Sequence, residues 1–191
     1  SASVAGVTIV GEDLGTVPDG LRQALHDANI LSYRVLWFER DGEGFKEAAG
    51  YPPRALACLA SHDLPTFMGW RKGRDIAIEQ ELGILDAAQV EARKAQRRRE
   101  IAALDAMTGN TSREDADASI AAHGYVAAAP SSIMLIQADD LAQELDPLNV
   151  PGTDTERPNW RRRLTPTVEE LAARPFTRSI VARVKKARGN V

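Results

Sequence analysis

Two acidic motifs in this chain each follow a short apolar run. The first is Gly-Glu-Asp-Leu-Gly at residues 11–15, and the second is Ser-His-Asp-Leu-Pro-Thr at residues 61–66. Parallel α/β enzymes keep their chemistry at the carboxyl ends of strands, where such carboxylates would lie. Glu12 and the pair His62 and Asp63 are therefore candidate functional residues, provided that both apolar runs belong to one parallel sheet.

Each of these candidates also has a structural explanation. From the residues alone, a cap of the following helix explains Glu12 and Asp13 better, since carboxylates accept hydrogen bonds from the first N–H groups of a helix. His62 and Asp63 could form a local hydrogen-bonded turn or supply two ligands to a divalent metal. The metal explanation is poor, because the other two histidines lie in helical patterns without ligand spacing.

Four short apolar runs are predicted strands. Between the first two, residues 21–28 follow a helical period after the turn Pro-Asp-Gly. Alternation of strands with helices is typical of a parallel sheet, so the predicted fold class is α/β. The predicted strands are residues 7–10, 32–38, 55–60 and 132–137.

The middle third of the chain is predicted to be helical. Residues 75–107 are rich in Ala, Glu, Gln, Arg and Lys, and Asp86 with Gln89 forms a capping pair before a long stretch of them. The basic run at residues 93–99 is flanked by glutamates and has no interleaved aromatic residues. A solvated helix face therefore explains it better than a nucleic-acid contact. We interpret about residues 75–130 as a helical insertion.

The last quarter is predicted to hold a structured loop and terminal helices. Residues 139–165 follow the last predicted strand, and they have few apolar residues but contain Asn159 and Trp160. Such aromatic and amide content favours an ordered loop over a flexible tether. Residues 166–191 are predicted helices, because Thr167 with Glu170 makes a capping box.

Composition excludes several classes of partner. The 191-residue chain has a formal charge of −3 and a pI near 5.7, so binding to nucleic acid or to anionic lipid is not expected. No apolar stretch approaches the roughly 20 residues of a membrane span, and the start lacks the pattern of a signal peptide. We therefore expect a soluble, cytoplasmic protein.

No cofactor is expected. Cys58 is the only cysteine and lies in an apolar run, so it is interpreted as a core residue rather than a nucleophile or zinc ligand. Residues 11–20 lack the lysine and the spacing of a phosphate-binding loop, so no nucleotide is expected either.

The predicted sheet raises a problem of closure. A complete (β/α)8 barrel takes about 250 residues, whereas four parallel strands make about half of one. Half a barrel would leave two exposed sheet edges. Either the chain is part of a larger enzyme or it forms a smaller open sheet.

Six segments in order carry a resemblance to a known family. The chain resembles the C-terminal part of the 4-α-glucanotransferases, also called amylomaltases or disproportionating enzymes (glycoside hydrolase family 77). The resemblance runs from about residue 7 to residue 165 and covers less than half of the family's usual length. The segments are residues 11–15, 60–66, 69–70, 137–140, 149–153 and 159–161.

The resemblance implies a fold and an activity. It implies the C-terminal half of a TIM barrel in residues 1–191, with the helical insertion described above. The implied enzyme is a retaining transferase that moves α-1,4-glucan segments between maltooligosaccharides through a covalent glycosyl-enzyme. The nucleophilic aspartate of the family lies upstream in a segment that this chain lacks. The isolated chain is therefore expected to be inactive without an N-terminal half of the barrel.

The resemblance also assigns roles to the candidates. Glu12 maps onto the family's acid/base, Asp63 onto its third carboxylate, and His62 onto a neighbouring residue that binds sugar hydroxyls. A retaining mechanism needs two carboxyl groups about 5–5.5 Å apart, one protonated and one ionised. Asn159 and Trp160 are further substrate-binding candidates, because a pyranose face packs well on an aromatic ring. The other two tryptophans, like Trp160 itself, also have a core interpretation.

Two alternatives remain. The chain could be a non-catalytic glucan-binding or folding module, or an unrelated open α/β protein with a local likeness to the family. If the piece folds alone, a homodimer through its exposed sheet edges is expected.

Overall fold

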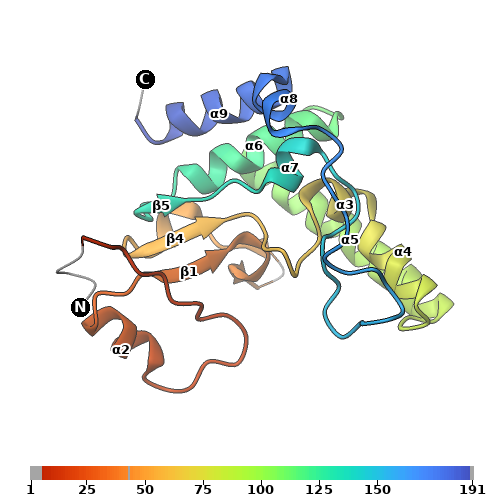
Figure 1. The fold of residues 1–191 in the computed structure, drawn as a ribbon, viewed down its shortest axis with the longest axis horizontal. Coiled ribbons are helices and arrows are strands. Elements are labelled where there is room, and N and C mark those ends of the chain that lie inside the picture. Colours follow the sequence, from red (N-terminus) through yellow and green to blue (C-terminus); the bar gives the residue numbers. More distant parts are fainter. Residues whose placement is uncertain (1–5, 43, 190–191) are drawn as a thin grey trace.

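A short parallel sheet forms the centre of the molecule. The computed structural model describes residues 6–42 and 44–189. Its three parallel strands are β1 (Ser32–Val35), β4 (Ala55–Cys58) and β5 (Ile133–Met134), in the order β1-β4-β5. Pairing of Val35 with Cys58 and of Leu56 with Ile133 sets the register. Figure 1 shows α6 and α9 stacked above this sheet and α2 below it. The predicted α/β class is confirmed.

The first predicted strand is only a bridged edge segment. Val10 pairs in parallel with Leu31, and the amide of Leu31 donates to the carbonyl of Ile9 at 2.9 Å. Val7 is 59% exposed and Ile9 is 44% exposed. The extended geometry lasts for a single bridge, because this segment has a strand on one side only. The segment pairs in the predicted parallel direction, but residues 7–10 do not form the predicted strand.

The other three predicted strands are shorter than expected, and the run 55–60 ends as strand β4 at Cys58. The run 32–38 ends as a strand at Val35, and its last residues form a 3₁₀ turn, η1 (Leu36–Phe38). The run 132–137 keeps only the two residues of β5. A hairpin that the sequence did not predict follows η1, made of β2 (Arg40–Asp41) and β3 (Gly44–Phe45) and leading to η2 (Ala48–Gly50).

Most of the predicted helices are present, and both predicted capping boxes form. Asp86 caps α5 together with Gln89, and Thr167 caps α8 together with Glu170. The stretch 75–107 is divided, because Gly83 with φ of 70° follows α4. The helices are α2 (Leu21–Asp27), α3 (Phe67–Lys72), α4 (Arg74–Glu81), α5 (Ala87–Thr108), α6 (Asp115–Ala127), α7 (Ala138–Ala142), α8 (Val168–Ala173) and α9 (Pro175–Ala187). None of those within the described residues is both long and apolar enough to span a membrane.

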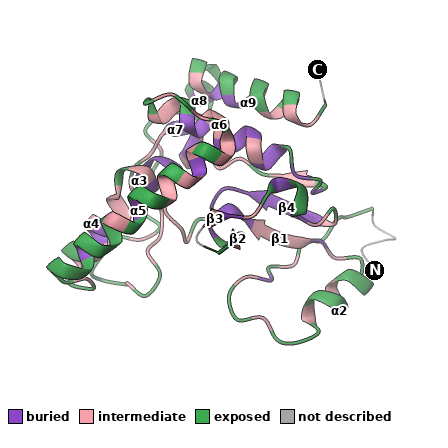
Figure 2. Ribbon diagram, turned by 180° about the vertical axis from the view of Figure 1, so that it is seen from behind, coloured by how far each residue is buried: buried purple, intermediate pink, exposed green. Residues whose placement is uncertain are grey.

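Aromatic side chains fill the core beside β4. The rings of Trp37 and Trp70 stack with centroids 4.4 Å apart, and Phe67 lies 6.2 Å from Trp37. Buried residues concentrate in β4 and in α6, which lies between the sheet and α9 (Figure 2). Cys58 is buried in this core as predicted, and burial raises the pKa of its thiol to about 11. These stacked rings contribute about 0.5–1.5 kcal/mol per pair beyond the area that they bury.

Segment 144–145 docks against the start of α3. The hydroxyl of Thr66 accepts a hydrogen bond from the amide of Gly69 at 3.0 Å and donates to the carbonyl of Glu144 at 2.6 Å. A Cβ atom added at Gly69 would collide with the carbonyl oxygen of Leu145. Only glycine permits this approach, which explains why a glycine occupies the third position of the helix.

We predict that Gly69→Ala destabilises the protein by about 1–3 kcal/mol, because the backbone of segment 144–145 must move away from α3. Thermal unfolding measures the loss. The matched control is Gly44→Ala, where the added methyl group would meet only the carbonyl of Asp41 at 3.6 Å. Equal stability of the two variants would contradict the proposed close approach.

Candidate functional site

The sheet brings both acidic motifs to one edge. The extended segment that ends at Gly11, strand β1 and strand β4 all run in the same direction. Their carboxyl ends therefore lie on the same side, where Glu12 and the segment 61–66 follow. Strand β1 separates them, since Val10 pairs with the residue before β1 and β4 pairs with the far side of β1.

Asp63 lies in a cluster formed by three separate segments. The side-chain amide of Asn149 donates a hydrogen bond to Oδ1 of Asp63 at 2.6 Å. Nε2 of His62 lies 3.3 Å from Oδ2 of the same carboxylate. The imidazole of His62 is also 5.1 Å from the indole of Trp160, centroid to centroid. Three of the predicted site residues thus meet here, and Asn149 joins them.

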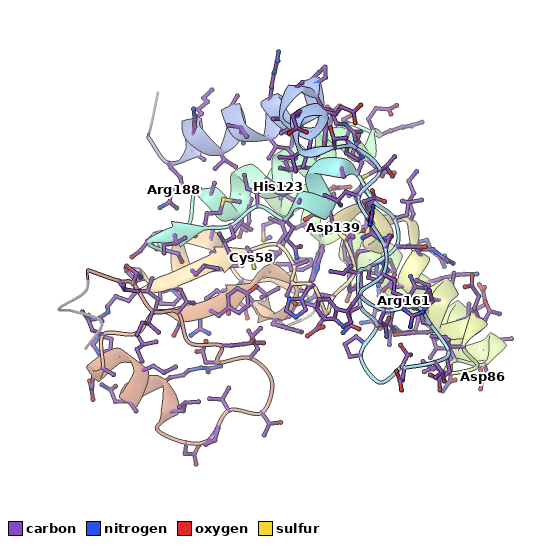
Figure 3. All side chains as sticks on the ribbon, viewed as in Figure 1. Cys58, Asp86, His123, Asp139, Arg161 and Arg188 are labelled. Atoms are coloured by element: carbon purple, nitrogen blue, oxygen red, sulfur yellow. The ribbon has the colours of Figure 1, made fainter. Side chains whose placement is uncertain are left out.

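The loop that carries Trp160 is held by its own hydrogen bonds. The side-chain nitrogen of Asn159 donates to the carbonyl and hydroxyl oxygens of Thr153 at 3.1 and 2.8 Å. Its side-chain oxygen accepts from the backbone amide of Val150 at 3.2 Å. Trp160 has φ of 63°, which is uncommon for a bulky residue, and its amide donates to Leu148. These bonds hold an indole that is 58% exposed beside His62. Arg161 marks this loop in Figure 3.

These contacts give Asn159 a structural task. Its side-chain amide is engaged on both sides within the loop, so it shapes the platform that holds Trp160. Direct contact of Asn159 with a ligand stays a prediction.

Glu12 and Asp13 have opposite environments. Asp13 is 1% exposed and accepts hydrogen bonds from the amide of Tyr33 at 2.8 Å and from Arg34 at 3.1 Å. Burial raises the pKa of Asp13, but the Tyr33 hydrogen bond and the charge of Arg34 outweigh it, so the net pKa is lowered. Glu12 is exposed and forms no hydrogen bond or ion pair with the rest of the described chain.

The capping explanation for these acids is wrong for the helix that follows them. Helix α2 begins after Gly20, which provides no side-chain cap. Asp13 instead ties the first acidic motif to β1, while Glu12 is left facing solvent. Its charge contributes to the raised pKa of Tyr33, after the larger effects of burial and of Cys58. No hydrogen bond joins Glu12 to Asp63.

Sequence reasoning missed two residues at this edge. Asn149 belongs to a motif that was noted, yet its contact with Asp63 depends on a loop path that no local pattern reveals. Phe38 is 51% exposed at the end of η1, directly after β1. The apolar run 32–38 includes Phe38 and predicts strand over its whole length, so it gave no reason to expect this side chain on the surface.

The cluster opens into two hollows. A depression of about 460 Å³ is bounded by the loop from Asn149 to Arg161 and includes Trp160. A smaller one of about 90 Å³ is lined by Asp63, Pro65 and Asn149 among others. Among the described residues, no group of three or more His, Cys, Asp and Glu side chains has the arrangement of a metal site. The side chains present suit hydrogen bonding and aromatic packing with a neutral polar ligand.

A buried acid supports the segment that carries Asp63. Oδ1 of Asp140 accepts a hydrogen bond from the amide of Phe67 at 2.7 Å. Nε2 of His123, on α6 (Figure 3), lies 3.9 Å from Oδ2 of Asp140, too far for a hydrogen bond, and neither atom has a hydrogen-bond partner in the described chain. Burial raises the pKa of Asp140 to about 7 and lowers that of His123 to about 4. Burial thus favours the uncharged form of both side chains.

A family profile described as 4-alpha-glucanotransferase, glycoside hydrolase 77, matches residues 1–169 of this chain. The chain belongs to this family. The resemblance noted from six short segments is thereby confirmed over most of the sequence.

Individual relatives agree with the family assignment. A 4-alpha-glucanotransferase of Haemophilus influenzae is 29% identical over 94% of this chain, and one of Mycobacterium tuberculosis is 30% identical over 84%. The chain spans only 28% and 24% of the lengths of these two proteins.

Solved structures show the same likeness. The crystal structure of amylomaltase from Corynebacterium glutamicum matches all of this chain with a TM-score of 0.83 and 27% identity, and the match covers 30% of that chain. An amylomaltase from Streptococcus agalactiae in complex with acarbose matches 97% of this chain and 33% of that one, with a TM-score of 0.59. At 16% identity, the second match supports the fold alone.

We predict that Asp140→Asn changes the pH dependence of stability. The folded-state pKa of Asp140 is raised from 3.8 to about 7, so folding takes up a proton and stability falls as the pH rises through this window. The asparagine keeps an acceptor for Phe67 but does not titrate. The variant should gain stability relative to the native protein by up to about 1.4 kcal/mol per pH unit between pH 4 and 7.

Thermal unfolding at several pH values measures this difference. The lowered pKa of His123 acts in the opposite direction, so the loss of stability as the pH falls from 6.5 toward 4 should persist in the variant. The exposed Asp19→Asn is the control and should leave the profile unchanged. Parallel profiles for Asp140→Asn and the native protein would refute a raised pKa at Asp140.

Proposed function

We propose that this chain is the C-terminal half of the TIM-barrel domain of a retaining 4-α-glucanotransferase. Family membership and the likeness to the Corynebacterium glutamicum amylomaltase over the whole chain support this proposal. The parallel sheet, with acidic residues gathered at its carboxyl edge, is consistent with part of such a barrel. In this proposal about residues 75–130 are a helical insertion, residues 139–165 continue from α7 into a loop beside the site, and α8 and α9 are the terminal helices.

The observation that carries the proposal is the set of contacts around Asp63. Asn149 occupies one carboxylate oxygen and His62 lies beside the other, while the exposed ring of Trp160 stands next to them. A fixed, ionised carboxylate can accept hydrogen bonds from sugar hydroxyls and stabilise the positive charge of an oxocarbenium-like transition state. The imidazole of His62 can add a donor to a hydroxyl of the same sugar.

Glu12 serves as the acid/base in this proposal. Its carboxyl group protonates the glycosidic oxygen as the α-1,4 bond breaks, and an aspartate that this chain does not contribute attacks C1 to form the glycosyl-enzyme. The resulting Glu12 carboxylate then removes the proton from the 4-hydroxyl of an acceptor glucan. That oxygen attacks C1 and releases the aspartate, so the enzyme returns to its starting state. The free position of Glu12, next to the anchored Asp13, suits a side chain that must reach a leaving oxygen.

The edges of the sheet require partners in this proposal. The exposed edge at Val7 and Ile9 is the side to which the N-terminal half of the barrel would pair. In its absence, a homodimer through the sheet edges is the expected substitute. The isolated chain is proposed to be inactive, since it lacks the nucleophile.

We predict that Glu12→Gln lowers disproportionation of maltotriose by about 10²–10⁴-fold in the protein that carries this chain, because the leaving oxygen is no longer protonated. Glucose and longer maltodextrins are the products to measure. A glycosyl fluoride donor needs no proton on its leaving group, so formation of the glycosyl-enzyme from it should be largely retained. The exposed Glu169→Gln is the matched control and should keep native activity.

Three outcomes would count against these assignments. Normal transfer by Glu12→Gln would remove the acid/base role, and equal loss with both donors would indicate a structural defect. Binding of maltotriose without any transfer by the native protein would favour a non-catalytic glucan-binding module.

We predict that Trp160→Ala weakens maltotriose binding by about threefold to tenfold, the usual loss when an aromatic platform is removed. Trp160→Phe should retain most of the affinity, because a ring remains beside His62. Titration calorimetry measures both values. Val168→Ala, at an exposed apolar residue of α8, is the control; a similar loss in this variant would show that the effect is not specific to Trp160.

A further inference from the structure

Two buried polar atoms face each other between α6 and α7. Nε2 of His123 and Oδ2 of Asp140 are 3.9 Å apart, and the two side chains are 0% and 1% exposed. Neither atom has a hydrogen-bond partner in the described chain. Buried polar atoms without partners are rare and costly in native proteins. Two of them side by side point to a shared requirement.

The hydrogen on the ring of His123 is placed by a backbone carbonyl. Nδ1 lies 2.8 Å from the carbonyl oxygen of Ser119. A carbonyl oxygen only accepts hydrogen bonds, so Nδ1 carries the hydrogen in this contact. In the neutral ring, the lone pair is therefore on Nε2, on the side of Asp140.

The carboxyl group of Asp140 has one oxygen in use and one free. Oδ1 accepts the hydrogen bond from the amide of Phe67 at 2.7 Å, which leaves Oδ2 for His123. A single proton between Oδ2 and Nε2 would satisfy both atoms once they close to hydrogen-bond distance. Without that proton, a buried carboxylate faces the lone pair of an imidazole, which is unfavourable.

The surroundings favour Asp140 as the residue that carries the proton. Burial raises the pKa of Asp140 to about 7, and the charge of Asp139 adds to this effect. Burial lowers the pKa of His123 to about 4. The acid therefore holds a proton more readily than the imidazole beside it.

Other charged groups around Asp140 are engaged elsewhere. Within the described chain, His123 is the only basic side chain within 4 Å of this carboxyl group. Cys58, on β4, has a pKa raised to about 11 and titrates well above Asp140. Three arginines on neighbouring segments bind other groups: Arg71 of α3 binds Asp105 and Asp115, Arg162 binds Asp139 and Glu144, and Arg174 donates to Ala142 and Gln143.

The pair is connected to the candidate site through the chain that follows α7. Thr66 donates to the carbonyl of Glu144, and Asn149 donates to Asp63. Together with the bond from Phe67 to Asp140, these contacts hold the segment 63–67 from three positions. A change in the spacing of α6 and α7 at Asp140 therefore acts on the residues that carry Asp63.

We propose that Asp140 and His123 form a proton-holding pair that positions the segment 63–67 and loosens it when the pair loses its proton. Both are positioning residues, because they are closed to solvent and do not reach a ligand. The inference rests on the proposed function only for the choice of maltotriose as a probe of the site.

Asp140→Asn tests the proposal, because its side-chain nitrogen can donate to His123 and its oxygen can accept from Phe67 at every pH. Titration calorimetry with maltotriose on the protein that carries this chain should give equal affinities for native protein and variant at pH 6. At pH 8 the native protein should bind about tenfold more weakly, since about a tenth of its molecules keep the proton one unit above the pKa. His62 is present in both proteins, so its effect cancels in the ratio.

Two further variants separate the members of the pair from general charge effects. His123→Gln offers an oxygen as acceptor and does not titrate, so it should keep the native fall in affinity between pH 6 and 8. The exposed Asp19→Asn is the control and should also behave like the native protein.

Two measurements follow the pair without any glucan. Infrared spectroscopy should show the carbonyl stretch of a protonated carboxyl group in the native protein at pH 6, and this band should be absent from Asp140→Asn. Hydrogen–deuterium exchange of residues 63–70 should be faster in the native protein than in Asp140→Asn at pH 8, and equal in the two at pH 6.

Three results would overturn the proposal. An unchanged ratio of maltotriose affinities from pH 6 to 8, with equal exchange of residues 63–70, removes the coupling to the site. Absence of the infrared difference at pH 6 removes the proton from Asp140. Loss of the pH dependence in His123→Gln, with its retention in Asp140→Asn, assigns the proton to His123 instead.

Failure of the proposed function has a different signature. If the native protein neither binds nor transfers maltotriose at any pH, the glucanotransferase assignment fails. The infrared band and the exchange of residues 63–70 then still decide whether the pair holds a proton and positions the segment.

Discussion

The candidate site depends on the docking of segment 140–149 against the start of α3. Asp140 holds the amide of Phe67, Thr66 donates to the carbonyl of Glu144, and Asn149 donates to Asp63. These bonds connect positions more than seventy residues apart in the chain. Gly69 lets the two backbones approach closely, while Asp140 and Asn149 each hold one end of the segment 63–67. Without this docking His62 and Trp160 would not meet.

In the first acidic motif, the neighbouring residues Glu12 and Asp13 have different environments. Asp13 is buried and hydrogen-bonded to Tyr33 and Arg34, so it anchors the motif to β1. Tyr33 and Arg34 bind Asp13 and not Glu12, so Glu12 stays exposed at the same sheet edge as Asp63. In the proposed mechanism Glu12 is free to reach a substrate oxygen, while Asp13 holds the motif in place.

Arginines organise the helices in a similar way. Arg71 binds Asp105 through two hydrogen bonds and Asp115 through a third, and thereby joins α3 to α5 and to the start of α6. Arg97 joins α5 to α4 through Asp75 and covers Trp70. Such paired, planar contacts specify geometry because a guanidinium and a carboxylate match each other in only a few orientations.

The sequence by itself determined the α/β class, the two capping boxes, the core position of Cys58 and the family, because these rest on local periodicity, local hydrogen bonds and ordered motifs. It also indicated Glu12, His62, Asp63 and Trp160 as candidates. Only the tertiary structure decided that Asn149 contacts Asp63, that Asn159 shapes its own loop and that Asp13 is the anchor. Strand lengths were also decided there, since an edge segment with a neighbour on one side pairs only at Val10. The physical reason is common to all of these: the partner of each group lies far away in the chain, and the docking of segments, rather than local propensity, selects it.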